Sequence, residues 1–307
     1  MSQAVRNRPS IYDLIPAVAT LVLEVESEGS RQSYKTDSYV FLKWLLYQGI
    51  ELHGLSYHVM LLYKNYLLNT YAKATAVKRF IIARRVLQVA VRMKIIAENP
   101  ADGIKTHIRP EDSKPHVALS KTEARQLLAS VDTSTAKGKR DYAILLTLIL
   151  TGVRRSELVA ITMGDIIAKS GHRVLVVQHG KGNKRREVVL RPEVFHAIRI
   201  YLEAVNRLNE PLDAPVFVAF NKGGAIKHKM SDKAVEHLVK QQGALVGLDI
   251  TPHDLRSTAI TFLVNTGSPI IQVQRVVGHQ SPTTTERYYT RQQDLDDSPV
   301  YKISLQD

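Results

Sequence analysis

A stretch rich in helix breakers divides this chain near the end of its first third. Residues 101–117 hold two prolines, one glycine and no hydrophobic periodicity, a composition typical of an exposed linker. The chain has 307 residues, which is too long for one small hydrophobic core. We therefore expect two domains, residues 1–105 and 118–307, joined by a linker at residues 106–117.

The first domain carries apolar residues at helical spacing. Ser10 and Asp13 form a predicted capping box for a helix that runs to Gly29, and Ser30 is expected to cap a second helix that ends at Gly49. Residues 56–70 and 74–97 predict two more helices, and the Asn99-Pro100 step is expected to stop the last one. The pattern indicates an all-α bundle of four or five helices.

The second domain mixes helices with a few short strands. A capping box at Ser120 and Glu123 precedes a helix through Leu128, and the apolar run 141–150 predicts a central helix that Gly152 ends. Residues 173–179 and 186–190 are β-branched runs that predict a hairpin, followed by helices at 192–209 and 231–246 around an apolar segment at 215–220. The expected class is mainly α with a small antiparallel β-sheet (α+β).

The charge of the chain points to a polyanionic partner. The formal net charge is +13 and the sequence pI is about 9.8, with a basic excess in both halves, so nucleic acid is favoured over an acidic membrane surface. The chain has no cysteine, which excludes disulfides and thiolate zinc sites. No apolar run approaches the roughly 20 residues that span a bilayer, and no signal-peptide core opens the chain, so a cytoplasmic protein is expected.

Residues 251–289 concentrate the side chains that carry chemistry. His253 and Arg256 stand three apart after Thr251-Pro252, which places both on one face of a first helical turn. Gly278 is expected to end a later helix, with His279 directly after it, and a last short helix is expected to carry Tyr288-Tyr289. Each of these signals is weak alone, because histidines after glycine and tyrosine pairs occur often as capping or packing residues.

Two further motifs change that assessment. Together with TGVRRSEL at 151–158 and GKGNK at 180–184, the stretch resembles the catalytic signature of the tyrosine recombinases, the phage integrase family, and the length is similar to that of the small Xer-type members. The resemblance implies a C-shaped, two-domain DNA clamp with a SAM-like helical core-binding domain followed by the catalytic domain. It also implies six catalytic residues, namely Arg154, Lys181, His253, Arg256, His279 and Tyr288.

The chemistry implied by the resemblance needs no metal, ATP or other cofactor. Tyr288 would attack the scissile phosphate to form a 3′-phosphotyrosyl link, Lys181 would protonate the leaving 5′-oxygen, and the arginines and histidines would hold the phosphate. Lys184 is the fallback for Lys181, and Tyr289 is expected to pack in the interior. The implied pathway passes through a Holliday junction.

The expected partner is a double-stranded DNA recombination site held by a homo-tetramer on two sites. The need for a second recombinase or an accessory protein stays open, and residues 296–307 are expected to dock on a neighbouring subunit. Basic side chains expected to contact DNA are Lys73, Lys78, Arg79, Arg84, Arg85, Lys184 and Arg185. The alternative for the helical ones is a solvated face.

Three alternatives remain at this stage. Arg154 suits a simple salt bridge with Glu157, and Arg155 stands where many members of the family have a small or apolar residue, so it could compete for the site. A type IB topoisomerase uses almost the same residues, although the compact first domain and the short tail after Tyr288 favour a recombinase. A catalytically idle DNA-binding module is the third alternative.

Overall fold

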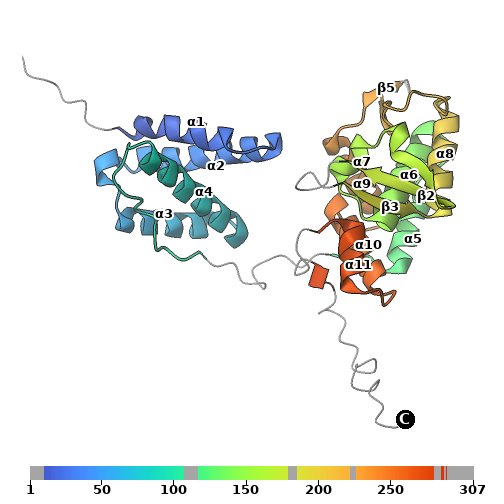
Figure 1. Cartoon of the computed structure of the whole chain (residues 1–307). Helices are drawn as coiled ribbons and strands as arrows, with labels where there is room; N and C mark the ends of the chain where they lie inside the picture. Colours follow the sequence, from blue (N-terminus) through green and yellow to red (C-terminus); the bar gives the residue numbers. More distant parts are fainter. Residues whose placement is uncertain are drawn as a thin grey trace, which may run out of the picture. The chain divides into compact units, whose positions relative to one another are not determined.

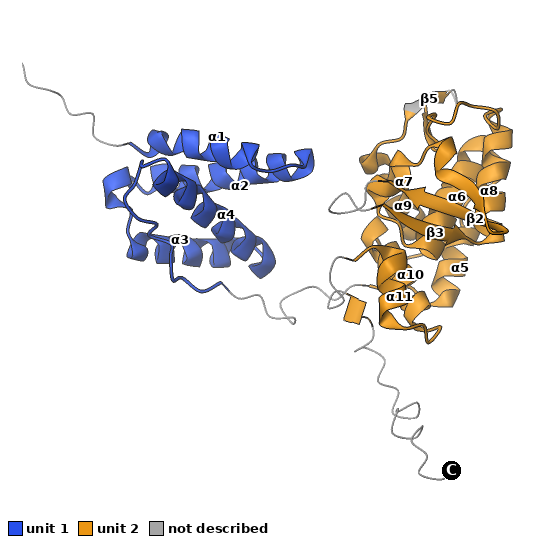
Figure 2. Cartoon of the chain, in the orientation of Figure 1, with its two compact units in different colours: residues 1–115 blue, residues 116–307 orange. Residues whose placement is uncertain are grey.

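The computed structural model describes residues 10–106, 117–178, 185–221, 226–279, 285–286 and 288. The chain divides into two compact units, residues 1–115 and 116–307 (Figure 2). Each unit has a hydrophobic core of its own. The division falls inside the stretch that the sequence marks as a linker.

All regular elements in residues 10–106 are helical (Figure 1). In chain order they are η1 (Ile11–Leu14), α1 (Ile15–Leu23), α2 (Glu28–Tyr47), η2 (Leu52–Gly54), α3 (Tyr57–Thr70) and α4 (Lys73–Arg92). Helix α4 contacts α1, α2 and α3, and the Tyr63 ring lies 4.9 Å from Phe41 and 5.0 Å from Trp44 between ring centroids. These buried rings stabilise the bundle, since aromatic side chains bury large apolar areas.

Two helix boundaries in this unit differ from the sequence-based prediction. The capping box at Ser10 is confirmed, but α1 ends at Leu23, and the cap of α2 is Ser27, whose side chain accepts from the N–H of Ser30. Gly29 therefore lies in the first turn of α2, where the first N–H groups need no intrahelical partner, so a glycine there does not stop the helix.

Helix α4 ends five residues before the predicted position 97, and proline is not the cause. Lys94 adopts a left-handed conformation with φ +59°, and the N–H of Ile95 returns to the carbonyl of Ala90 at 2.9 Å. This 6→1 bond is the Schellman closure of a helix C-terminus. The Asn99-Pro100 step then lies in an irregular segment.

The described part of the second unit is mainly helical and contains two small sheets. Its elements are α5 (Lys121–Ala129), α6 (Ala136–Thr151), α7 (Arg155–Ala160), η4 (Met163–Asp165), β1 (Ile166–Lys169), β2 (His172–Val177), β3 (Arg186–Leu190), α8 (Pro192–Ala204), β4 (Val218–Phe220), β5 (Ile226–Lys229), α9 (Asp232–Leu245), α10 (Pro252–Val264) and α11 (Ile270–Val277). The predicted class, mainly α with a small antiparallel sheet, is confirmed.

The predicted hairpin forms two strands of a three-stranded antiparallel sheet in the order β1-β2-β3. Val174 pairs with Val189 and Leu175 with Val188, which sets the register of β2 and β3. Strand β1 has no counterpart in the prediction, because it has only four residues, of which two are exposed and thus give little alternation. The apolar segment at 215–220 ends in β4, which pairs with β5.

Helix α6 forms the centre of the second core. Ile144, Leu145 and Leu148 are entirely buried, and α6 contacts both α8 and α10. Gly152 ends α6 in the left-handed conformation with φ +63°, as predicted, and its N–H returns to the carbonyl of Leu148 at 3.1 Å. A Cβ at this position would lie 3.2 Å from the Cβ of Ala259 in α10, so a glycine also allows α10 to approach the end of α6.

Among the helices that the structure describes, none has the length and apolar character needed to cross a membrane.

Candidate active site

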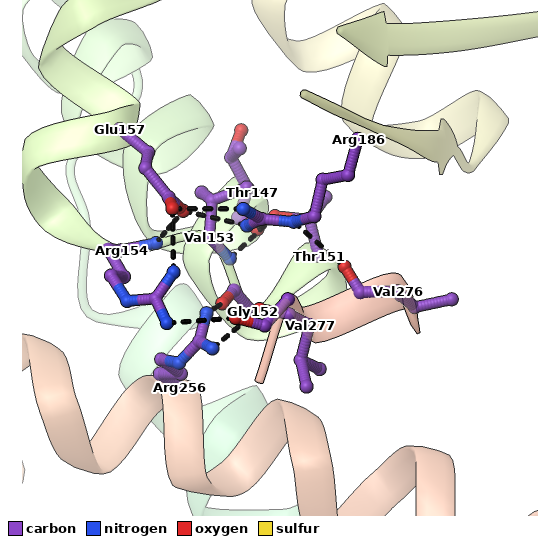
Figure 3. A network of polar contacts seen from close by, with 11 residues as sticks. Thr147, Thr151, Gly152, Val153, Arg154, Glu157, Arg186, Arg256, Val276 and Val277 are labelled. Atoms are coloured by element: carbon purple, nitrogen blue, oxygen red, sulfur yellow. Dashed lines mark hydrogen bonds and ion pairs between the residues drawn. The ribbon is translucent and has the colours of Figure 1, made fainter. Parts of the chain in front are cut away.

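Two helices of the second unit end on left-handed glycines, and their last carbonyls face arginine side chains. Gly152 follows α6 and Gly278, with φ +69°, follows α11. The last carbonyls of a helix have no intrahelical partner and carry the negative end of the helix dipole, so they favour cations. Gly152 and Val277, the last residue of α11, lie in the network of Figure 3.

Arg256 is the most buried arginine of this network. It lies in α10, which begins with a capping box formed by Thr251 and Asp254, and its side chain is only 4% exposed. Its Nη1 donates to the carbonyl of Gly152, and its Nη2 donates to the carbonyl of Val277 at 2.6 Å. Burial, followed by the charge of Arg154, lowers its pKa to about 10. The guanidinium therefore stays positively charged at neutral pH.

Arg154 reaches the same place from the N-cap position of α7. Its Nη1 donates to Glu157 Oε1 at 2.8 Å, and its Nη2 donates to the carbonyl of Gly278 at 3.0 Å. The salt bridge with Glu157 that the sequence suggests as an alternative is thus present. It does not withdraw Arg154 from the site, because the other end of the guanidinium meets the turn before His279.

Sequence reasoning did not identify Glu157 and Arg186 as members of the site. Arg186, the first residue of β3, donates from Nη1 to Glu157 Oε1 at 2.9 Å and from Nη2 to Oε2 at 2.7 Å. Burial alone would raise the pKa of Glu157, but hydrogen bonds from Arg186 and Arg154 outweigh it and lower the pKa to about 2. The available signal was the i,i+3 spacing of Arg154 and Glu157, which is that of a capping box.

Three arginines from three elements therefore meet three consecutive carbonyls at the end of α11. Arg186 Nε donates to Val276 at 3.1 Å, Arg256 to Val277 and Arg154 to Gly278. Figure 3 shows these guanidiniums grouped between Glu157 and the end of α11. The arrangement gathers positive charge at one point, which suits an anionic ligand.

His279 follows this turn directly. Its Nδ1 lies 2.8 Å from Thr285 Oγ1, and its own carbonyl accepts from Gln274 Nε2 at 3.1 Å. Burial and the charges of Arg256 and Arg154 lower its pKa to about 4. The imidazole is therefore neutral at neutral pH and its Nε2 stays available as a second hydrogen-bonding atom.

Tyr288 is buried against α10 and α11, with 8% of its surface exposed. Its hydroxyl lies 3.3 Å from Ser257 Oγ, and its ring lies 6.5 Å from the ring of His279 at an interplanar angle of 24°. It also packs in a small cluster with Ile260, Val264, Val273 and Val277. Tyr289 lies outside the described residues, so the choice between the two tyrosines stays a prediction.

His253 marks the solvent side of the site. It lies on the surface in the first turn of α10, and partial burial of the ring together with the charge of Arg256 lowers its pKa. A hollow of about 440 Å³ opens here, lined by three arginines and two carboxylates among other residues. The residues that line it are Arg154, Arg155, Ser156, Asp232, Glu236, Thr251, Pro252, His253 and Arg256.

Arg155 points away from the carbonyls that hold Arg154 and Arg256. Its guanidinium forms ion pairs with Glu236 and, at 3.6 Å, with Asp232, both on α9. Both arginines line the hollow, but Glu157 and the carbonyl of Gly278 hold Arg154, whereas carboxylates of α9 hold Arg155.

The structure does not describe Lys181 and Lys184, which fall within residues 179–184. Arg185, directly after that stretch, is exposed, and its Nη2 lies 3.5 Å from Glu187 Oε1. The assignment of Lys181 as the proton donor therefore stays a prediction. The C-terminal residues 296–307 also lie outside the described part.

The basic side chains of α4 differ in their exposure and in their contacts within the bundle. Lys73 and Lys78 are exposed, and Lys78 lies 3.0 Å from Asp37, which also receives Arg79 at 3.1 Å. Arg84 donates to the carbonyl of Ile104, and Arg85 donates to the hydroxyl of Tyr34 at 2.5 Å. The three arginines thus stabilise the bundle as well, which the sequence pattern did not indicate.

Within the described residues, no group of three or more histidine, aspartate or glutamate side chains is arranged to hold a metal ion.

Two family descriptions cover most of this chain. The Phage integrase family matches residues 118–295, and the Phage integrase SAM-like domain matches residues 13–108. Tyrosine recombinase XerD of Pseudomonas aeruginosa is 30% identical over 267 residues, which cover 85% of this chain and 86% of that protein. The Phage integrase family range includes every residue of the network described above.

Solved structures agree at the level of the fold. The XerH site-specific recombinase in a post-cleavage complex with palindromic difH substrate has a TM-score of 0.71 at 16% identity, with 98% of this chain and 99% of that chain covered. A lambda integrase tetramer bound to a Holliday junction has a TM-score of 0.66 at 15% identity, covering 92% and 78%. The chain therefore belongs to the phage integrase family and is a tyrosine recombinase of the Xer-like kind.

Proposed function

We propose that this recombinase cuts and rejoins double-stranded DNA at specific sites through a covalent 3′-phosphotyrosyl intermediate on Tyr288. The observation that carries the proposal is the convergence of Arg154 and Arg256 on the end of α11, beside His279. A planar guanidinium binds phosphate through two parallel hydrogen bonds and remains charged. Tyr288 lies beside the same site, with its ring 6.5 Å from the ring of His279 and its hydroxyl 3.3 Å from Ser257 Oγ.

The proposed reaction conserves the number of phosphoester bonds. The hydroxyl oxygen of Tyr288 bonds to phosphorus as the bond to the 5′-oxygen breaks, and Lys181 supplies the proton that this leaving oxygen takes up. Arg154, Arg256 and His279 stabilise the charge that develops on the non-bridging oxygens, while His253 accepts the phenolic proton or holds the phosphate. A 5′-hydroxyl of the partner strand then attacks the phosphotyrosine and releases Tyr288.

Each unit has a proposed part in holding DNA. Residues 1–105 act as the core-binding domain, residues 106–117 as the linker of a C-shaped clamp, and residues 118–307 as the catalytic domain with its C-terminal tail. Support comes from the basic excess of both halves and from the SAM-like domain match at 13–108. Lys73 and Lys78 are the exposed candidates of α4 for phosphate contact. Replacing a phosphate-contacting lysine reduces the slope of log affinity against log salt by about one.

The active assembly is proposed to be a homo-tetramer that joins two DNA sites in the cytoplasm. The lambda integrase tetramer on a Holliday junction is a precedent for this assembly within the same fold. A heteromeric partner recombinase or an accessory protein is the alternative. Crosslinking of the full chain on paired sites, with and without cell extract, separates these assemblies.

The decisive test is covalent trapping on nicked duplexes drawn from the genome that encodes the chain. A nick next to the scissile phosphate releases a short fragment after cleavage, so the adduct cannot be resealed. We expect a protein–DNA adduct with the wild type and with Tyr289→Phe, and none with Tyr288→Phe. An adduct lost only in Tyr289→Phe would identify Tyr289 as the nucleophile instead of Tyr288. Supercoil relaxation of plasmids without any such site indicates topoisomerase activity instead.

A further inference from the structure

Arg186 lies outside the motifs that identify the family, yet it bonds to two elements of the arginine site. Its side chain is 9% exposed and contacts two elements at once, because its two terminal nitrogens bind Glu157 of α7 and its Nε binds the carbonyl of Val276 in α11. A Cβ at position 278 would lie 2.9 Å from Arg186 Nη1. The guanidinium therefore fills the space beside the turn that leads to His279.

The carboxylate of Glu157 is saturated by four hydrogen bonds. Oε1 accepts from the side chains of Arg154 and Arg186, and Oε2 accepts from the main-chain N–H of Arg154 and from Arg186. An ionised carboxylate offers about four acceptor positions. Since Arg186 occupies two of them in the parallel geometry, Arg154 can place only one guanidinium nitrogen on Glu157.

Saturation of Glu157 matters for the chemistry of Arg154. Without Arg186, the buried Glu157 would keep its charge with Arg154 as its nearest cation, and a parallel two-bond pair between them would become the favoured geometry. Such a pair would turn the nitrogens of Arg154 toward Glu157. The loss of Arg186 would also remove one positive charge from the site.

We propose that Arg186 is a positioning residue that keeps the guanidinium fork of Arg154 directed toward the scissile phosphate. It does so by occupying Glu157 and by joining the start of β3 to the end of α11. Strand β3 begins one residue after the stretch 179–184, which contains Lys181, so Arg186 also joins the start of β3 to the turn before His279. This inference rests on the proposed function.

The test separates cleavage from DNA binding in the full-length chain. With the nicked substrates described above, Arg186→Gln is expected to lower the rate of adduct formation about 100-fold, the scale of an approximately 1 Å misplacement of a reacting group. DNA affinity and its salt dependence are expected to match the wild type, because Arg186 is buried and does not face the solvent. Arg199→Gln serves as the control, since Arg199 is an exposed arginine of α8 paired with Glu203 at 3.1 Å.

A second substitution distinguishes positioning from plain structural support. In Glu157→Gln/Arg186→Gln the carboxylate charge that would capture Arg154 is gone, so the double variant is expected to form adduct at least about tenfold faster than Arg186→Gln. If Arg186 acted only as structural support, the two defects would add and the double variant would be the slower one. Arg186→Lys, which keeps the charge but not the parallel pair, is expected to lie between Arg186→Gln and the wild type.

Denaturant unfolding of each variant accompanies the rates. If Arg186→Gln fails to fold, the comparison of Arg186→Lys with Glu157→Gln/Arg186→Gln decides. A rate for Arg186→Gln equal to that of the wild type overturns the inference, as does a double variant slower than the single one. Failure of the wild type itself to form adduct on any substrate counts against the proposed function instead.

Discussion

Arg154 Nη2 donates to the main-chain carbonyl of Gly278 across 3.0 Å, although the two residues are 124 positions apart in the chain. The bond joins the turn after α6 to the turn after α11. Because His279 follows Gly278 directly and Arg256 binds the carbonyls of both turns, the groups proposed to hold the phosphate are fixed in one rigid unit. Such rigidity matters since stabilising a transition state requires donors that are already in place.

Replacing Arg256 is expected to affect catalysis more than binding. Arg256→Ala removes one phosphate fork and should reduce the rate of adduct formation about 10²–10³-fold, the usual cost of losing one such donor. Arg256→Lys should recover little, because a single ammonium cannot satisfy both carbonyls and the phosphate. Single-turnover cleavage of the nicked duplex measures this, with Arg275→Ala on the exposed side of α11 as the control. A rate near that of the wild type for Arg256→Lys would contradict the claim that cleavage needs the guanidinium of Arg256.

Gly278→Ala and Gly267→Ala form a matched pair for the turn before His279. Both glycines have φ near +70°, but a Cβ has no atom within 4 Å at Gly267, whereas at Gly278 it meets Arg186. We expect Gly267→Ala to cost about 1–2 kcal/mol of unfolding free energy through the left-handed backbone alone. Gly278→Ala should cost ~1–3 kcal/mol more from overpacking, since the bonds to Glu157 hold the Arg186 guanidinium in place.

Urea unfolding at neutral pH measures this difference, and the adduct assay should show a loss only for Gly278→Ala. Equal unfolding free energies for the two variants would mean that Arg186 moves freely, and would weaken its proposed role as well.

The lowered pKa of His279 predicts a loss of stability on mild acidification. A histidine with a pKa of about 4 in the folded state and about 6.5 in the unfolded state binds more protons when unfolded. The unfolding free energy therefore falls as the pH drops from about 6.5 to about 4 and has no further contribution from this group below that range. His253, whose pKa is also lowered, adds in the same direction. Glu157, whose folded pKa is about 2, adds in the same direction once the pH approaches its unfolded pKa of about 4.3, because only the unfolded carboxyl is then protonated.

Denaturant unfolding at about pH 7.5 and about pH 5 tests the assignment. His279→Gln should lose less stability between the two pH values than the wild type, and His237→Gln, an exposed histidine of α9, should behave like the wild type. An unchanged pH dependence in His279→Gln would show that other groups cause the effect.

Arg155 offsets the negative charge of two carboxylates that line the hollow, Asp232 and Glu236. Three arginines and two carboxylates line the hollow, so Arg155→Ala leaves Asp232 and Glu236 without their arginine partner, facing an incoming phosphate. DNA affinity should fall severalfold at about 50 mM salt and less at about 200 mM, as expected for a screened charge. Adding Glu236→Gln to Arg155→Ala should restore part of the loss in a fluorescence anisotropy titration. A double variant that binds more weakly than Arg155→Ala would refute this account.

The family, the class of fold and the central helices followed from the amino-acid sequence. The capping box at Ser120 and Glu123 and the stop at Gly152 appear where predicted, because caps and left-handed turns depend on side chains within a few residues of each other. Competition between neighbouring helix-end signals explains the wrong boundaries of α2 and α4. Ser27 rather than Ser30 caps α2, and a left-handed Lys94 follows the end of α4. In both cases the predicted boundary rested on a short-range signal, and a similar signal a few residues earlier in the chain set the observed boundary.

The composition of the site beyond the motif residues depended on tertiary structure. Nothing in the sequence around Arg186 indicates that it binds Glu157, or that consecutive carbonyls of α11 accept from arginines of α7, β3 and α10. These bonds exist only because α6, α10 and α11 pack together and bring the ends of two helices to the same point. Local sequence thus determined which residue types were present and where helices end. The free energy of long-range packing decided which of those residues meet.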